Sequence, residues 1–428
     1  MKFYDDENSA VNCRHIDVLD GIRALGILIV VWLHIWEQNW LMPILDTPSL
    51  AFLGIHSINL DWIPRTGYMM VNLIIFISGF CLYLPYARHT VYGEKLPSLK
   101  SFAKKRFARI LPSYLFCVLA IFAYNIITSA YTSPECTMYR DSTFMWKDLI
   151  TRLTFTFNLI PSISMHSLLN GALWTVALEV QFYIIFPLLA KGFLKKPILT
   201  YSAMSLVSFA FIYWANGKDT VVTYMHQLPS YLGIFANGFL GALLFTYMTK
   251  SIKRNKYIAI ISTVISIICC YGYYLAMKGL RNADYSQKWQ MNSRFLLSML
   301  FIIFVISSAY SLPFYRKIYS NKVAVFFSTI SFNLYMWHQF IGGALKKHRI
   351  PYYPDYPDGQ GPNQAGDKTW MWGHFILSIV ISIIIATLTT YLIEKPFSKY
   401  ILSKKKTEEN PKNVSNNASK RRKGLSSK

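Results

Sequence analysis

Residues 20–34 read DGIRALGILIVVWLH, an apolar stretch with an arginine near its start and a histidine at its end. A helix needs about 20 predominantly apolar residues to cross the hydrocarbon core of a bilayer. Runs of comparable length recur along the chain. We expect ten spans, near residues 21–39, 68–87, 110–130, 172–190, 198–215, 228–249, 257–277, 295–312, 323–343 and 371–393. The sequence therefore predicts an all-α, polytopic membrane helix bundle.

The composition supports this class of protein. Of 428 residues, 53% are hydrophobic and 15% are charged, whereas soluble domains carry about 25% charged residues. This balance excludes an ordinary soluble enzyme and a disordered chain. The formal net charge of +23 does not indicate nucleic-acid binding, because the basic residues lie in short loops and in the tail rather than along one face. The six cysteines show no metal-ligand spacing.

The positions of Lys and Arg predict the orientation. With both termini in the cytoplasm, the inner segments hold about 31 of the 44 basic residues, as the positive-inside rule requires. Residues 148–165 are apolar, but a span there would place the lysines of the following loop outside, against the positive-inside rule. We therefore expect an interfacial or re-entrant segment on the outer side. We expect one transmembrane domain over residues 1–402, in the plasma (cytoplasmic) membrane. Residues 403–428 are expected to form a disordered basic tail that contacts anionic lipid.

Charged side chains inside predicted spans are costly and therefore mark candidate functional residues. Arg23 and His34 are eleven residues apart, which returns to within about 20° of the same helix face. Glu179 and Tyr183 are four residues apart and share a face of the fourth span. His34, Glu179 and His338 fall at similar predicted depths. We expect them to line a single water-accessible chamber that opens outward.

The inner side carries a second pattern. Arg106 and Arg109 end the basic loop 88–109 just before the third span, and two guanidinium groups near a helix N-terminus make a good anion site. In the second span, Ser78 and Gly79 permit a kink or a close backbone approach. Pro396 follows Glu394 and Lys395, and we expect it to end the last helix.

In their joint order these residues resemble the acyltransferase family 3 integral membrane proteins, which O-acylate surface polysaccharides and peptidoglycan. The resemblance runs from about residue 14 to residue 400. The residues that carry it are Leu19-Asp20-Gly21, Arg23-x10-His34, Phe76-Ile77-Ser78-Gly79-Phe80, Arg106-x2-Arg109 with Pro112 and Tyr114, Trp174-x4-Glu179-x3-Tyr183-x3-Pro187, Ser331-x3-Tyr335-x2-His338 and Ile393-Glu394-Lys395-Pro396.

The resemblance implies transfer of an acyl group, commonly acetyl from cytoplasmic acetyl-CoA, to a hydroxyl of an extracytoplasmic carbohydrate. It implies that His34 is the catalytic base and that Glu179 and Arg23 belong to the catalytic set. The expected donor-binding residues are Arg106, Arg109, Ser78 and Tyr114. The expected acceptor-binding residues are His338, Tyr183, Tyr335, Trp174 and Asn72. No metal is expected.

The residues also agree with this chemistry. A histidine with an ordinary pKa near 6.5 can take a proton from a sugar hydroxyl near neutral pH. Direct transfer and a transient acyl group on His34 both stay open, as do the acceptor, the acyl length and the oligomeric state.

Each candidate has a simpler interpretation. His34 could be a buried histidine that joins two helices, and positive-inside anchoring alone could place Arg106 and Arg109. The alternative function is a transporter or exporter of a glycan or small polar molecule, which also uses polar residues at mid-membrane. Such proteins usually show inverted repeats, and we find none in this sequence. Binding of CoA or acetyl-CoA distinguishes the two functions.

Overall fold

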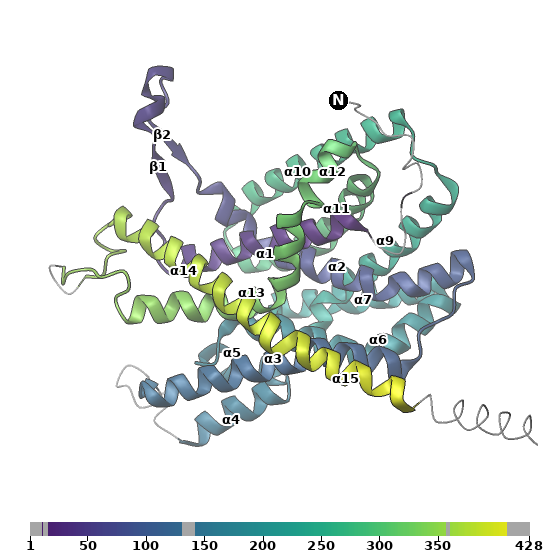
Figure 1. The fold of residues 1–428 in the computed structure, drawn as a ribbon, viewed down its shortest axis with the longest axis horizontal. Helices are drawn as coiled ribbons and strands as arrows, with labels where there is room; N and C mark the ends of the chain where they lie inside the picture. The colour runs from purple at the N-terminus through teal and green to yellow at the C-terminus, as the bar shows by residue number, and fades with distance from the viewer. Residues whose placement is uncertain (1–10, 12–15, 131–141, 357–359, 409–428) are drawn as a thin grey trace, which may run out of the picture.

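The computed structural model describes residues 11, 16–130, 142–356 and 360–408, and it is almost entirely helical (Figure 1). The α-helices are α1 (Asp17–Glu37), α2 (Trp62–Tyr92), α3 (Leu99–Ile127), α4 (Ser142–Leu153), α5 (Pro161–His166), α6 (Trp174–Lys195), α7 (Pro197–Asn216), α8 (Val221–Met225), α9 (Leu232–Ser251), α10 (Lys256–Arg281), α11 (Ser286–Tyr310), α12 (Pro313–Tyr319), α13 (Lys322–Lys347), α14 (Lys368–Thr389) and α15 (Lys395–Glu408). Short 3₁₀ turns are η2 (Pro48–Leu53), η5 (Phe157–Leu159), η6 (Gly171–Leu173) and η7 (Leu228–Tyr231), and η9 (Thr390–Glu394) is a π-helical turn.

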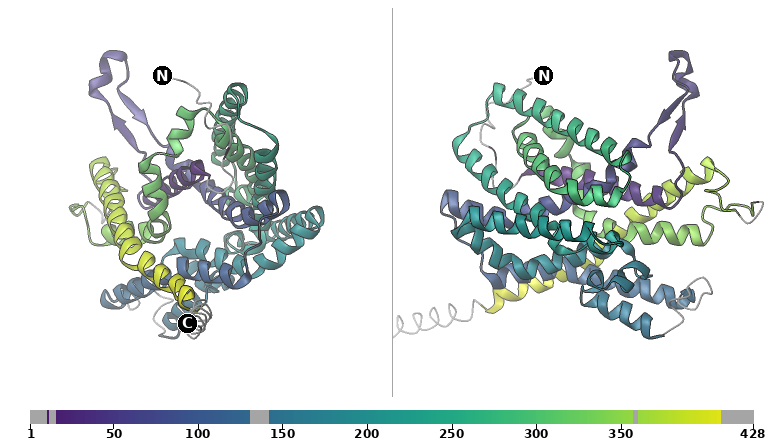
Figure 2. Two further views of the ribbon diagram at one scale, coloured as in Figure 1. Left: turned by 45° about the vertical axis from the view of Figure 1, so that its right-hand side comes forward. Right: turned by 180° about the vertical axis from the view of Figure 1, so that it is seen from behind.

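Within the described ranges, nine helical segments are long and apolar enough to cross a membrane. They lie side by side in a bundle, which confirms the all-α, multi-pass fold (Figures 1 and 2). They correspond to nine of the ten predicted spans. The sides of the membrane on which the two termini lie stay a prediction.

The one remaining predicted span, residues 323–343, forms α13, which has 26 residues but is not among these nine segments. Its polar side chains explain the difference. Ser331, Asn333 and His338 are buried, because α13 packs against α1 and α14 instead of presenting these residues to lipid. A helix covered on several sides by protein can carry polar residues that a lipid-exposed helix cannot.

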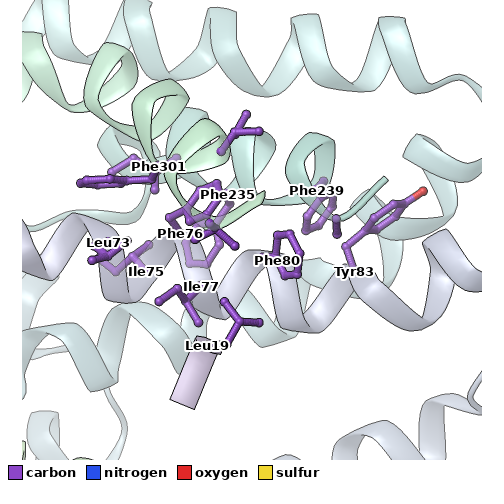
Figure 3. Close-up of a cluster of buried hydrophobic side chains, with 14 of the residues drawn as sticks. Leu19, Leu73, Ile75, Phe76, Ile77, Phe80, Tyr83, Phe235, Phe239 and Phe301 are labelled. Atoms are coloured by element: carbon purple, nitrogen blue, oxygen red, sulfur yellow. The ribbon is translucent and has the colours of Figure 1, made fainter. Parts of the chain in front are cut away.

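The centre of the bundle is an aromatic core between α2 and α9 (Figure 3). Phe182 and Phe235 stack with ring centroids 3.5 Å apart, and Figure 3 shows Phe76 beside Phe235. The ring centroids of Phe76 and Phe80 are 6.2 Å apart. A Cβ added to Gly238 would lie 2.8 Å from both the carbonyl oxygen of Phe76 and the amide nitrogen of Phe80. The two helices therefore touch backbone to backbone, and Gly79 faces Phe235 at this crossing, as predicted for a close approach.

Within the described residues, one short sheet accompanies the helices. Strands β1 (Ile44–Asp46) and β2 (Ser57–Asn59) pair antiparallel, with Ile44 opposite Asn59. This hairpin projects from the bundle between α1 and α2 in every view (Figures 1 and 2). No hairpin is predicted here from the sequence.

The third span begins earlier than predicted. Helix α3 starts at Leu99, and the Ser98 hydroxyl caps it by accepting from the amide of Ser101 at 3.2 Å. Arg106 and Arg109 are therefore about two turns inside a helix. The prediction that a helix N-terminus lies at these arginines and contributes to anion binding is therefore wrong. Any affinity for an anion has to come from the guanidinium groups themselves.

The last helix does not end at Pro396. Helix α14 continues through the π-helical turn η9 into α15, giving one apolar segment from Lys368 to Ser403. Proline lacks an amide donor and usually interrupts a helix. The wider i→i+5 turn accommodates it, so the helix continues. Asn333 holds this turn, because its side-chain amide donates to Thr390 Oγ1 at 2.8 Å and to Glu394 Oε2 at 2.7 Å.

Two further predictions concern segments at the edges of the bundle. Residues 148–165 form parts of α4, η5 and α5, none of which is long enough to span a membrane, and their interfacial position stays a prediction. Residues 403–408 of the predicted tail belong to α15, whereas 409–428 lie outside the described residues. The division of the chain at residue 402 therefore also stays a prediction.

Candidate active site

A cavity of about 390 Å³ lies near the start of α1, between α2, α3, α6 and α13. We call it the arginine cavity. Its charged lining residues are Arg23, Arg88, Arg106, Arg109, Asp20 and Glu179. Four guanidinium groups and two carboxylates give the lining of this cavity a net positive charge, which favours an anionic ligand.

Arg106 is the best-defined cation in the arginine cavity. Its guanidinium carbon lies 5.8 Å from the ring centroids of both Phe102 and Tyr183. Its buried Nε has no hydrogen-bond partner in the described part of the chain. Tyr183 in turn donates to Glu179 Oε2 at 3.1 Å, which confirms that these two residues share a face of α6. The rings thus hold Arg106 in place against the wall of the arginine cavity.

A second cavity of about 480 Å³ lies near the end of α1, and we call it the histidine cavity. His34 lines it together with Asn72, Trp174, His226 and Arg294. Its polar lining also includes Gln287, Gln290 and Gln339. Amide and aromatic side chains of this kind are suited to the hydroxyls and apolar faces of a small polar molecule.

His34 is tied to His338 on α13. Nδ1 of His34 lies 2.7 Å from Nε2 of His338, and the two rings stack with centroids 5.0 Å apart. The other nitrogen of His338, Nδ1, lies 3.2 Å from the carbonyl oxygen of Leu334. His338 is fully buried and does not line the cavity, whereas His34 does.

This arrangement determines where the protons lie. The Leu334 carbonyl can only accept, so a neutral His338 carries its proton on Nδ1 and accepts at Nε2. Nδ1 of His34 must then donate to His338. Nε2 of His34 is left without a proton, which is the form that a general base needs.

The two cavities adjoin. Val71 and Tyr335 line both of them. Tyr335 is buried, its ring centroid lies 5.6 Å from that of His338, and its hydroxyl lies within hydrogen-bonding reach of the Thr175 side chain. A buried hydroxyl therefore lies where the arginine cavity meets the histidine cavity.

The aromatic wall of the histidine cavity is built by the turn that starts α6. Asn170 adopts a positive φ of 71°, and its side-chain oxygen accepts from the amide of Ala172 at 3.1 Å. This turn places Trp174, which stacks on His226 with centroids 4.1 Å apart. Burial, with the charge of Arg294 nearby, lowers the pKa of His226 to about 3. His226 is therefore neutral at physiological pH.

The predicted residues separate into two groups. The arginine cavity takes Arg23, Ser78, Arg106, Arg109, Glu179, Tyr183 and Tyr335, and the histidine cavity takes His34, Asn72, Trp174 and Tyr335. The expectation of one chamber for His34, Glu179 and His338 is wrong, because Glu179 lines the arginine cavity.

Two predicted contact residues line neither cavity. Tyr114, predicted for the donor, is buried elsewhere, donates to the Arg152 carbonyl at 2.9 Å and stacks on Phe155. His338, predicted for the acceptor, lies behind His34.

Sequence reasoning missed His226 and Arg294. Each lies just outside a predicted span, at 228–249 and 295–312, where a basic residue looks like an ordinary interfacial side chain. Only the packing of α11 against α8 and η7 brings them to the cavity wall. Within the described residues, no three or more His, Cys, Asp or Glu side chains come together as a possible metal site.

The fold and these cavities define a multi-pass membrane protein with a cationic and a histidine-bearing cavity side by side. The model of the acyltransferase domain family (acyltransferase 3) matches residues 16–392, and the chain belongs to this family.

Curated relatives agree with the family. The chain is 25% identical over 407 residues to "Putative O-acetyltransferase SACOL0978" of Staphylococcus aureus strain COL, covering 90% of this chain and 58% of that protein. It is 23% identical over 411 residues to O-acetyltransferase OatA of S. aureus strain NCTC 8325, with the same coverage of 90% and 58%. The chain thus spans less than two thirds of the length of these relatives. No solved structure gives a significant match.

Proposed function

We propose that this protein transfers an acyl group, most simply acetyl from acetyl-CoA, to a hydroxyl group of an extracytoplasmic carbohydrate. The observation that carries the proposal is the contact between the two cavities at Tyr335, which joins a cationic site to a histidine base. The names of the curated relatives describe O-acetyltransferases, which supports acetyl as the group transferred.

The arginine cavity suits the phosphate groups of a CoA thioester. Arg106 and Arg109 line it from α3, with Arg109 exposed, and Arg23 lines it from α1. Bidentate guanidinium groups match phosphate oxygens well. When bound, the donor supplies an activated acyl carbonyl and a thiolate leaving group. Glu179 and Tyr183 act here by positioning Arg106.

His34 serves as the general base. Its unprotonated Nε2 takes the proton from the acceptor hydroxyl, while His338 holds the ring and accepts from Nδ1. The acceptor oxygen forms the new ester bond as the carbon–sulfur bond of the donor breaks. The proton on His34 then passes to the departing thiolate, so the products are the ester and CoA with a free thiol.

Tyr335 is the candidate for stabilising the charge that develops during transfer. Its hydroxyl is buried at the junction, beside the Thr175 side chain that lines the same cavity. It can therefore donate to the carbonyl oxygen that becomes negative as the acceptor attacks. Donors aimed at such an oxygen typically contribute about 10²- to 10³-fold to the rate.

Release of free CoA thiol from acetyl-CoA by the purified protein tests the proposal. Wild type and His34→Ala are compared with several carbohydrate acceptors, and His56→Gln at an exposed histidine serves as the control. We expect acceptor-dependent release that His34→Ala abolishes. Absence of release and of acetyl-CoA binding, across several acceptors and acyl donors, would refute the proposal.

A further inference from the structure

Arg294 lines the histidine cavity from α11 and is only 2% exposed. Gln287 and Gln290 line the same cavity from the same helix. These three residues follow one another at spacings of three and four, so they form one polar stripe along a single face of α11. The stripe faces the space that His34 also faces.

The partners of Arg294 are all uncharged. Nη1 donates to Ser230 Oγ at 2.7 Å and to the carbonyl oxygen of Met225 at 3.2 Å. The guanidinium carbon lies 4.1 Å from the centroid of the Tyr231 ring. Its Nε is buried and has no hydrogen-bond partner in the described part of the chain. A buried cation held only by neutral groups is incompletely compensated.

The other arginine of this cavity differs in one respect. Arg152 is also almost completely buried, but its Nε lies 3.6 Å from Asp148 Oδ1, so it has a carboxylate partner. Glu37, the carboxylate that lines the histidine cavity, lies beside Tyr68 and makes no ion pair with Arg294. Arg294 thus forms no ion pair among the residues that the structure describes.

We propose that the acceptor carries an anionic group, a carboxylate or a phosphate, and that Arg294 binds it. The inference rests on the proposed function and names the acceptor class, an acidic sugar or a sugar phosphate. The same corner carries other groups suited to a sugar, since Trp174 and Tyr231 line the cavity with aromatic carbon and the two glutamines line it with amides. An anion here would complete the charge balance of the buried guanidinium and would orient a nearby hydroxyl toward His34.

A purely structural role for Arg294 is the competing explanation, because it ties α11 to Met225 and Ser230. The two roles differ in one measurable property, the preference for charge in the ligand. A structural arginine affects all sugars alike, whereas an anion-binding arginine affects only the charged ones.

The test measures direct binding of three sugars to the full-length purified protein by saturation-transfer NMR titration. The sugars are glucuronate, glucose 6-phosphate and glucose. Wild type is compared with Arg294→Gln, and Lys288→Gln on the same helix is the control, since Lys288 contacts Tyr285 and does not line the cavity. We expect at least one anionic sugar to bind on the order of 10- to 100-fold more tightly than glucose, the range for a charged hydrogen bond. The preference should vanish in Arg294→Gln and persist in Lys288→Gln. Which of the two anionic sugars binds more tightly distinguishes a carboxylate from a phosphate.

Two further variants cover the case in which Arg294→Gln fails to fold. Arg294→Lys keeps the charge and should keep part of the preference, and Ser230→Ala removes a structural contact of Arg294 and should leave the preference intact. Equal or undetectable binding of charged and neutral sugars by wild type, or a preference that survives Arg294→Gln, would overturn the inference.

CoA release is measured in parallel, which separates the inference from the proposed function. Anion binding through Arg294 without any CoA release would refute the proposed acyl transfer and leave the anion site standing. CoA release that is equally efficient with glucose and glucuronate, and unchanged in Arg294→Gln, would leave the transfer standing and refute the anionic acceptor.

Discussion

Nδ1 of His34 and Nε2 of His338 lie 2.7 Å apart although the residues are separated by 304 positions in the sequence. This pair joins α1 to α13 and, through the Leu334 carbonyl, determines which nitrogen of His34 is free of a proton. His338 therefore prepares the base without facing the cavity.

Substitution of His338 tests this relationship. His338→Phe removes the acceptor for Nδ1 of His34, so both tautomers of His34 become available and the ring loses its orientation. We expect kcat to fall by about 10- to 100-fold, as for loss of other orienting partners, with unchanged affinity for acetyl-CoA. His338→Gln, which keeps an acceptor oxygen, should recover part of the rate. An unchanged kcat in His338→Phe would show that the pair plays no part in transfer.

Tyr335→Phe separates catalysis from stability. Removal of the hydroxyl should lower kcat by about 10²- to 10³-fold. Because a single hydrogen bond contributes only about 0.5–1.5 kcal/mol net, loss of the contact between this hydroxyl and Thr175 should lower the free energy of unfolding by no more than that amount. The control is Tyr310→Phe, at a buried tyrosine that lines neither cavity. Thermal denaturation and steady-state kinetics of both variants measure the two effects. A Tyr335→Phe variant with the kcat of wild type would exclude the hydroxyl from the reaction.

Arg106→Gln should weaken binding of the donor. Loss of a charge-assisted bond to phosphate costs about 1.5–3 kcal/mol, or roughly 10- to 100-fold in Kd. Calorimetric titration with CoA measures the change, and Lys105→Gln, an exposed neighbour on α3, controls for loss of charge. Equal effects of the two variants would indicate a diffuse electrostatic contribution rather than a site.

Gly238→Ala tests the crossing of α2 and α9. The new Cβ would lie 2.8 Å from backbone atoms of Phe76 and Phe80, which cannot move as a flexible side chain can. We expect the variant to lose about 1–3 kcal/mol of stability, as overpacked cores do. Gly343→Ala, where a Cβ meets nothing within 4 Å, should be neutral or slightly stabilising. Similar melting temperatures for the two variants would contradict the close backbone contact.

The stability of the protein should fall in acid partly because of His226. Its pKa is about 3 in the folded protein, where burial is the main cause, against 6.5 as the ordinary value. Between these two values the unfolded chain binds a proton that the folded chain does not, so stability decreases as the pH falls from 6.5 toward 3. His226→Gln should show a shallower decline than wild type in melting temperatures measured across this range. His56→Gln, at an exposed histidine, should follow wild type.

Much of the architecture could be predicted because a bilayer imposes strong local rules. Nine predicted spans correspond to helices that meet the length and hydropathy requirements, since the hydrophobic run itself dictates the element. The face shared by Glu179 and Tyr183 follows from helical spacing alone and is confirmed by their hydrogen bond. The errors occurred where a basic run or a proline was taken as a boundary. Helix α3 already starts at Leu99, capped by Ser98, and the π-helical turn η9 carries the last helix past Pro396.

The grouping of the candidate site residues could not be read from sequence. Depth along each span placed Glu179 with His34, but Glu179 lines the arginine cavity, where it accepts a hydrogen bond from Tyr183. Tyr114 failed as a cavity residue for the same reason, since its face of α3 meets Phe155. Spacing gives relative angles within one helix and leaves the angles between helices to packing.

By itself, the sequence determined that this chain is a helical membrane protein with isolated polar residues on α1, α2, α3, α6 and α13, because hydrophobic length and helical period are local properties. Only the tertiary structure decided that His34 meets His338, that the arginines and His34 line separate cavities joined at Tyr335, and that Arg294 enters the second of them. Those relationships depend on how helices rotate and cross, and that is set by side-chain packing such as the contact of Gly238 with Phe76 and Phe80.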